Sequence, residues 1–197
     1  MNQSLRDDFD KWHDYGCLIK ERLLYFGSEF FEDNGEESGV DFASSAKLVK
    51  NLLYLDQVGK ANITLHYNSP GGDWDRGIAI YDCIKGLRSN VIFVGYGCVR
   101  SMGTVIMQAC KNRYLTPLCR FMIHDGTSGF YGNTEDHIRD GKEAEKICSQ
   151  MYEVYFERMV EKNPTVTIPQ IKKLCKNDTY MSGKRAVEVG LADKVLS

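Results

Sequence analysis

Apolar residues along the chain follow two patterns, short β-type runs and longer stretches with apolar positions at helical spacing. Runs rich in β-branched and aromatic residues predict strands at 18–26, 62–67, 91–96, 113–115, 120–124 and 193–196. Apolar positions three to four residues apart predict helices at 42–57, 74–87, 101–109, 134–162, 168–175 and 183–189. Because strands that alternate with helices are typical of βαβ units, we expect an α/β fold with a largely parallel sheet in one domain, 1–197.

Two segments lack a clear pattern. Residues 1–16 are polar and aromatic without periodicity, and we interpret 1–17 as a mobile N-terminal arm. Residues 32–41 are acidic and contain glycine, which predicts a loop or a helix entry. The polar N-terminus lacks the apolar core of a signal peptide, and the apolar stretches fall far short of the ~20 residues that span a bilayer. We expect no membrane association.

Composition narrows the function classes. A formal net charge of −2 and scattered Lys and Arg residues argue against a nucleic-acid partner. The seven cysteines are odd in number and irregularly spaced, which favours free thiols in a reducing compartment over a disulfide framework. The four histidines show no zinc-ligand spacing with them. We therefore expect a cytoplasmic protein without a metal or cofactor.

The turn at 68–72 (NSPGG) lies between a predicted strand and a predicted helix. Pro70 fixes one backbone angle, and Gly71 and Gly72 permit positive φ and the close approach of another backbone. Unobstructed N–H groups in such a turn can bind an anion or an oxyanion. Taken alone, however, the turn is better explained as a tight connection.

Ser101 stands at a second corner, where a predicted strand leads into an apolar helix. A serine at this position most often caps the helix. A strand-to-helix corner also exposes the hydroxyl, and it directs the Met102 N–H at developing negative charge. The segment does not match the G-x-S-x-G motif. His124 ends an apolar strand and Asp178 precedes a Ser182-capped helix, and each alone fits an ordinary structural residue.

In combination these segments resemble the proteolytic subunit of the Clp protease family from about Leu18 to the C-terminus. The resemblance is carried by four motifs in order, namely SPGG (69–72), SMG (101–103), MIH (122–124) and D-x-x-x-S-G-x-x-A-V-E-x-G-L-A-D (178–193). It implies a fold shared with crotonases, made of repeated β-β-α and βαβ units, and a serine endopeptidase. Ser101 would be the nucleophile, His124 the general base and Asp178 the acid that orients the histidine. The N–H groups of Gly72 and Met102 would form the oxyanion hole.

The resemblance also implies an assembly. In the family, identical subunits form heptameric rings, single or paired, that enclose the sites and admit unfolded polypeptides. Residues 126–162 would form a "handle", in which a strand at 126–132 lines the substrate channel and the helix at 134–162 contacts the opposite ring. Because the sequence contains no G-x-x-x-x-G-K-[ST] motif, a separate AAA+ ATPase would have to unfold the substrates.

The sequence departs from the family at several positions. Arg100 replaces a small residue before the nucleophile, and Asp125-Gly126 replaces Gln-Pro after the histidine. Lys176-Asn177 stands where a Glu-Arg pair links the rings, and Thr64 and His66 replace aromatic residues that help to bind the ATPase. These departures bear on ring coupling, pocket shape and choice of partner more than on the chemistry.

Alternatives come from other classes. An inactive structural or regulatory paralogue is disfavoured by the complete Ser/His/Asp set, whereas Arg100 and the altered ring contacts are compatible with it. A crotonase-type acyl-CoA enzyme shares the fold but has no need of this set, and a viral or organellar maturation protease remains open. Asp178 has competitors nearer in sequence to His124, namely Asp125, Asp136 and Asp140. Asp125 should point to the opposite face of the sheet, and the other two should lie at the start of the long helix.

Overall fold

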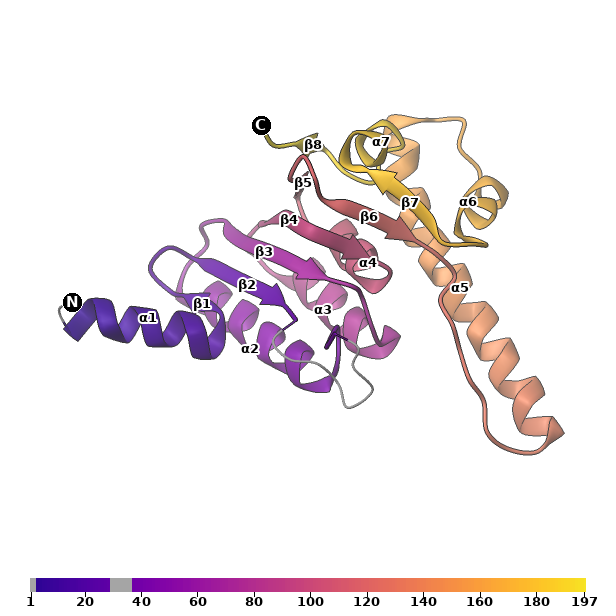
Figure 1. The fold of residues 1–197 in the computed structure, drawn as a ribbon, viewed down its shortest axis with the longest axis horizontal. Coiled ribbons are helices and arrows are strands. Elements are labelled where there is room, and N and C mark those ends of the chain that lie inside the picture. The colour runs from indigo at the N-terminus through magenta and orange to yellow at the C-terminus, as the bar shows by residue number, and fades with distance from the viewer. Residues whose placement is uncertain (1–2, 29–36) are drawn as a thin grey trace.

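A mostly parallel sheet with helices packed mainly on one face organises the computed structural model, which describes residues 3–28 and 37–197 (Figure 1). Within these residues the sheet has eight strands and the chain has seven helices. The strands are β1 (Cys17–Leu18), β2 (Leu23–Gly27), β3 (Ile63–Ser69), β4 (Val91–Arg100), β5 (Asn112–Leu115), β6 (Arg120–Ile123), β7 (Thr179–Ser182) and β8 (Lys194–Val195). The helices are α1 (Gln3–Tyr15), α2 (Phe42–Val58), α3 (Trp74–Gly86), α4 (Met102–Gln108), α5 (Thr134–Lys162), α6 (Ile168–Cys175) and α7 (Gly183–Glu188). The predicted α/β class is confirmed.

The long strand β4 connects two parts of the sheet. Strands β1, β2, β3, β4, β5 and β8 are neighbours in that order, and β6 pairs with β4 on one side and with β7 on the other. The first half of β4 pairs with β5 from Ile92 to Gly95, and the second half pairs with β6 from Cys98 to Arg100. All pairs are parallel except β1 with β2 and β6 with β7. The end of β4 therefore lies beside β6 and one strand away from β7.

One face of the sheet is buried under helices. Along β3 the side chains of Ile63, Leu65 and Tyr67 are buried, while the intervening residues are partly exposed. Figure 1 shows α2, α3 and α4 on the covered face of β2–β4. Tyr67 stacks on Phe26 with ring centroids 5.0 Å apart and contacts Phe93 at 4.9 Å, so aromatic side chains fill the space below the central strands.

The helix α5 is long and only half of it packs on the domain. Asn133 caps its N-terminus, and its buried residues are Met151, Tyr152, Tyr155 and Met159, all in the C-terminal half. Ile138, in the N-terminal half, is 55% exposed. In Figure 1 this half projects away from the sheet. The apolar positions of this helix are therefore fully buried only from Met151 onward, with Cys148 partly buried against the core.

Several predictions of local structure need correction. Residues 3–15 form a helix that the sequence did not predict; the predicted mobility of the arm is untested. Strand β7 was not predicted, and β4 runs on to Arg100 instead of ending at Tyr96. The predicted handle strand at 126–132 is irregular backbone in the described chain. Residues 29–36, which hold half of the predicted acidic loop, lie outside the described residues.

Candidate active site

The corner at Ser101 joins β4 to α4 with an unusual backbone conformation. Ser101 has φ 49° and ψ −123°, a region that residues with a Cβ atom rarely adopt. Its N–H donates to the Met122 carbonyl of β6 at 2.8 Å, and its carbonyl accepts the Thr104 N–H at 2.9 Å. Strained backbone of this kind is concentrated at functional sites. The corner turns the Ser101 side chain out of the sheet toward β6.

The three candidate catalytic side chains lie in one hydrogen-bonded row. Ser101 Oγ is 2.8 Å from His124 Nε2, and His124 Nδ1 is 3.0 Å from Asp178 Oδ1. Strand register explains this arrangement, because Arg100 pairs with Met122 in β4 and β6, and Ile123 pairs with Thr179 in β6 and β7. His124 therefore directly follows the middle strand, between the ends of its two neighbours.

The row fixes the tautomer of the histidine. A carboxylate accepts hydrogen bonds only, so the proton of the neutral ring belongs on Nδ1, facing Asp178. Nε2 is then free to accept the Ser101 hydroxyl proton. The His124 side chain is 21% exposed, whereas that of Asp178 is 57% exposed. The arrangement can transfer a proton from the hydroxyl to the ring.

The competing acids lie elsewhere. The Asp125 carboxylate accepts the Tyr152 hydroxyl of α5 at 2.7 Å. Asp136 accepts the Asn133 N–H in the cap of α5, and Asp140 lies beside Arg139 in the same helix. Of the four candidate acids, only Asp178 is hydrogen-bonded to His124 within the described residues.

The glycine turn packs directly against the Ser101 corner. Gly71 and Gly72 have φ of 108° and 146°, which a residue with a Cβ atom rarely adopts. Val40 anchors the turn, since its N–H donates to the Gly71 carbonyl and its carbonyl accepts the Asp73 N–H. The Gly72 N–H takes part in neither bond. A Cβ atom on Gly71 would lie 2.6 Å from Ser101 Cβ and 3.0 Å from the Met102 nitrogen. The Gly71 backbone, one residue before the candidate donor Gly72, therefore lies directly against the start of α4, where Met102 is the other candidate donor.

A cavity of about 670 Å³ opens beside Ser101 and His124. Its wall includes Gly72, Met102 and the irregular segment after His124. The remaining wall is largely apolar and comes from α3, α4 and α5, with Trp74, Val105, Ala144, Ile147, Cys148 and Met151, together with Asp73 and Asp125. A cavity of this size and polarity is typical of a binding site for a side chain or a small ligand.

The cavity also contains a thiol. Cys148 Sγ lies 3.7 Å from the Asp125 carbonyl oxygen. Burial raises the pKa of this thiol, and the nearby Asp125 carboxylate raises it further. Because the thiolate is the nucleophilic form, Cys148 is poorly suited to compete with Ser101. Burial and the hydrogen bond to Asp125 likewise raise the pKa of the Tyr152 hydroxyl, which stays a donor.

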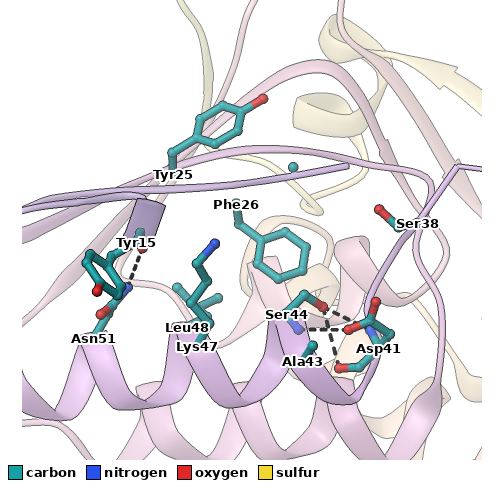
Figure 2. Close-up of a pocket in the computed structure, with 11 residues that line it drawn as sticks. Tyr15, Tyr25, Phe26, Ser38, Asp41, Ala43, Ser44, Lys47, Leu48 and Asn51 are labelled. Carbon is teal, nitrogen blue, oxygen red and sulfur yellow. Dashed lines mark hydrogen bonds between the residues drawn. The ribbon is translucent and has the colours of Figure 1, made fainter. Parts of the chain in front are cut away.

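A separate pocket of about 270 Å³ lies between β2 and α2, away from the predicted site residues (Figure 2). Figure 2 shows Tyr25, Phe26 and Leu48 among its lining residues, with the cap of α2 at one end. There the Asp41 carboxylate accepts the Ser44 N–H at 2.7 Å, and Asn51 donates to the Tyr15 carbonyl at 2.8 Å. These polar groups already make bonds that hold the fold, and we assign the pocket no chemistry.

Arg100, the departure next to the nucleophile, points away from the row. Its guanidinium lies 5.8 Å from the centre of the Tyr180 ring on β7, and Arg120 lies 5.6 Å from the same ring. Arg100 and Tyr180 both pair with Met122 and so share one face of the sheet. The charge therefore lies over an aromatic ring instead of in the cavity.

Two residues at the site were not recognised from the sequence as functional candidates. Thr104 and Tyr155 are fully buried behind Ser101, with their hydroxyl oxygens 2.6 Å apart. Tyr155 belongs to the apolar stripe of α5 and Thr104 to an apolar run, so both read as core residues. The signal that could have singled them out is the hydroxyl that each places at a core position.

Comparison with known proteins agrees with this geometry. The model of the Clp protease family matches residues 13–197 of the chain. The ATP-dependent Clp protease proteolytic subunit of Deinococcus radiodurans is 31% identical over 187 residues, which cover 92% of this chain and 83% of that protein. The family model spans the sheet, the Ser101 corner and the long helix, and by these two matches the chain belongs to the Clp protease family.

Proposed function

We propose that the chain is a serine endopeptidase that cleaves unfolded polypeptides with Ser101, His124 and Asp178 as its catalytic triad. The observation that carries the proposal is the unbroken row from Ser101 Oγ through the His124 ring to Asp178, with bonds of 2.8 and 3.0 Å. Membership of a peptidase family supports the reaction class.

Each residue then has one role. His124 Nε2 takes the proton of the Ser101 hydroxyl as its oxygen attacks the peptide carbonyl, and later returns that proton to the leaving amine. Asp178 keeps the other ring proton on Nδ1 and stabilises the ring while it is positively charged. The cavity beside Ser101 supplies the space for a substrate side chain.

The N–H groups of Gly72 and Met102 are the proposed oxyanion donors. The Met102 N–H begins α4, where the first N–H groups of a helix have no partner within the helix. The bonds that anchor the turn on Val40 do not use the Gly72 N–H. Two fixed backbone donors of this kind stabilise the charge that develops on the carbonyl oxygen.

We further propose a closed homo-oligomer, a heptameric ring or a pair of rings, supplied with substrate by an AAA+ ATPase in the cytoplasm. The projecting half of α5 leaves Ile138 exposed, which supports contact with another subunit. Exposed Leu53 and Tyr54 on α2 offer apolar surface for a partner. In the part of the chain that the structure describes, no helix combines the length and apolar character needed to cross a membrane.

A fluorophosphonate probe tests the proposal directly, because it reacts with an activated serine. The wild-type protein should be labelled at Ser101, and Ser101→Ala should lose both labelling and peptide cleavage. His124→Ala should fall to a similar residual rate, since triad members act as a unit. Labelling that persists in Ser101→Ala would refute the assignment. An unlabelled, inactive wild-type ring would instead favour the structural paralogue.

A further inference from the structure

A buried line of hydroxyl groups leads from α5 to the Ser101 carbonyl. The Tyr155 hydroxyl lies 2.6 Å from Thr104 Oγ1, and Thr104 Oγ1 lies 2.6 Å from the Ser101 carbonyl oxygen. The Thr104 N–H donates to the same carbonyl at 2.9 Å. Thr104 and Tyr155 both have 0% relative exposure, so no water competes for these bonds.

The direction of the line follows from counting protons. A hydroxyl has one proton to donate, and a carbonyl can only accept. The Thr104 proton therefore goes to the Ser101 carbonyl, and the Tyr155 hydroxyl must donate to Thr104 Oγ1. Burial raises the pKa of Tyr155 well above its usual value, so the hydroxyl keeps its proton.

The carbonyl that ends this line belongs to the same peptide unit as the Met102 N–H. A peptide unit is planar and trans, so the direction of its carbonyl fixes the direction of its N–H. We propose that Thr104 and Tyr155 are positioning residues that orient the Met102 N–H toward the oxyanion. The inference rests on the proposed peptidase function. Hydrogen bonds in a chain polarise one another, so donation to the carbonyl also strengthens the N–H as a donor.

The peptide needs such support because Ser101 is strained. With φ at 49°, rotation of the Ser101–Met102 peptide would relieve the backbone and turn the Met102 N–H away. The Thr104 hydroxyl opposes that rotation, and Tyr155 fixes the hydroxyl.

The same helix holds the other end of α4. The Arg158 guanidinium donates to the Gln108 carbonyl at 2.9 and 2.7 Å and to the Cys110 carbonyl at 3.2 Å. These contacts satisfy carbonyls that α4 leaves open at its C-terminus. Because α5 holds both ends of α4, the first peptide of α4 cannot shift without disturbing α5.

Removal of one hydroxyl tests the inference. In Tyr155→Phe we expect kcat to fall about 3- to 10-fold, the usual range for one hydrogen bond, while KM stays unchanged. The rate of fluorophosphonate inactivation at saturating probe should fall by the same factor, since the phosphoryl oxygen occupies the oxyanion position. Tyr67→Phe is the matched control. The Tyr67 hydroxyl is buried beside α4 and has no hydrogen-bond partner of normal geometry within the described residues, so its loss should leave kcat unchanged.

A second pair of variants tests the same role in case Tyr155→Phe does not fold. Thr104→Ser keeps the hydroxyl and should retain most of the activity, whereas Thr104→Val should lose about 10-fold or more in kcat. Loss of a whole oxyanion donor, 10²- to 10³-fold, is the upper limit. If Tyr155→Phe does not fold, the comparison of Thr104→Ser with Thr104→Val tests the positioning role in its place.

The outcomes separate the inference from the proposed function. An unlabelled wild type refutes the peptidase proposal. A labelled wild type whose Tyr155→Phe and Thr104→Val variants fold and match it in kcat refutes the positioning role alone. Equal losses of kcat and of melting temperature in Tyr155→Phe and Tyr67→Phe would mean that the hydroxyls act only through stability, which also refutes it.

Discussion

Ser101 is constrained on three sides by backbone rather than by its own side chain. Its N–H is bonded to Met122, its carbonyl to Thr104, and Gly71 packs on its Cβ atom. The Met122 and Gly71 contacts come from distant segments and only the Thr104 contact is local, so the conformation with positive φ is held largely by tertiary structure. The hydroxyl is thereby left free to bond His124.

We expect Gly71→Ala to disable the site without unfolding the domain. An added Cβ atom would lie 2.6 Å from Ser101 Cβ and 2.8 Å from the Arg100 carbonyl oxygen, and φ is 108°. The corner must shift, which should lower kcat/KM by about 10²-fold, as small misplacements at reacting groups do. Gly86→Ala is the control, because a Cβ atom there meets nothing within 4 Å. Steady-state kinetics measures kcat/KM of both variants, and circular dichroism measures whether they are folded. Normal activity in Gly71→Ala would show that the contact is not critical.

We expect Asp178→Asn to keep the fold and to lose turnover by up to ~10⁴-fold, the loss known for this exchange in a catalytic triad. The Asp178 side chain is 57% exposed, so its replacement should disturb little packing. An asparagine can donate to Nδ1 and so favours the wrong tautomer of His124. Asp136→Asn, at the start of α5, is the control and should cleave peptides normally. Near-normal turnover in Asp178→Asn would identify another acid as the partner.

The positions of these residues were predictable from sequence to different degrees. Ser101 and His124 each sit at the end of a strand that its apolar pattern makes visible, whereas Asp178 lies in a charged loop and was singled out only by the family resemblance. The residues that support them, Thr104 and Tyr155, could not be recognised from the sequence, because both look like core residues until the packing of α5 on α4 is known. Tertiary contacts between helices leave no local pattern in the sequence.

At the scale of elements, strand β6 lies between β4 and β7 and so brings the candidate site residues together. It is parallel to β4 and antiparallel to β7, which places the start of β7 beside its end. The sequence predicted β6 and the first part of β4. It did not predict β7, because the segment TYMS has four residues and directly follows a charged loop. It also ended β4 early, because Gly95 and Gly97 break the apolar run, although the strand continues past Gly97 with φ at 48°.

The buried Arg113 guanidinium joins β5 and the segment before β8 to the end of α4. The Arg113 guanidinium on β5 pairs with the Asp193 carboxylate and donates to Gln108 Oε1 at 2.6 Å and to the Gly190 carbonyl at 3.0 Å. Arg113 is 4% exposed. Its charge is therefore compensated almost entirely by protein groups.

We expect Asp193→Ala to lower the free energy of unfolding by about 3 kcal/mol, because it leaves a buried charge without its partner. Glu188→Ala, which removes the partner of Arg185 in a surface pair of 59% and 49% exposed side chains, should cost less than about 1 kcal/mol. Urea denaturation of both variants gives the comparison. Equal losses would mean that the Arg113 pair contributes no more than a surface pair.

At the scale of the whole molecule, the sequence predicted the α/β class and the long helix correctly because both follow from periodicity. The strand of the predicted handle does not follow from periodicity. The predicted strand at 126–132 is irregular in the single chain, and among the described residues its backbone pairs with no strand. A strand needs a second strand for its hydrogen bonds, so a segment that pairs between subunits would gain this structure only in the assembly.

The projecting half of α5 offers a surface for that assembly (Figure 1). A helix of 29 residues is about 44 Å long, and only its C-terminal half is buried in the single chain. The exposed half carries Ile138, 55% exposed, just after Tyr131, which is 99% exposed. Such apolar side chains on a projecting element are commonly buried by another subunit. With the heptameric ring proposed from the family resemblance, we expect native masses of seven or fourteen times 22.4 kDa.

Native mass spectrometry and light scattering on the full chain measure these masses. Ile138→Asp should convert paired rings into single rings, because it places a charge in the contact between the projecting helices. Lys142→Asp introduces the same side chain one turn later at an exposed polar position and should leave the pairing intact. The two variants must keep the melting temperature of the wild type for the comparison to hold, which the exposure of both positions makes the expected result. A 22.4 kDa species at every protein concentration would refute assembly itself. Identical masses for the wild type and Ile138→Asp would show instead that α5 does not form the contact between rings.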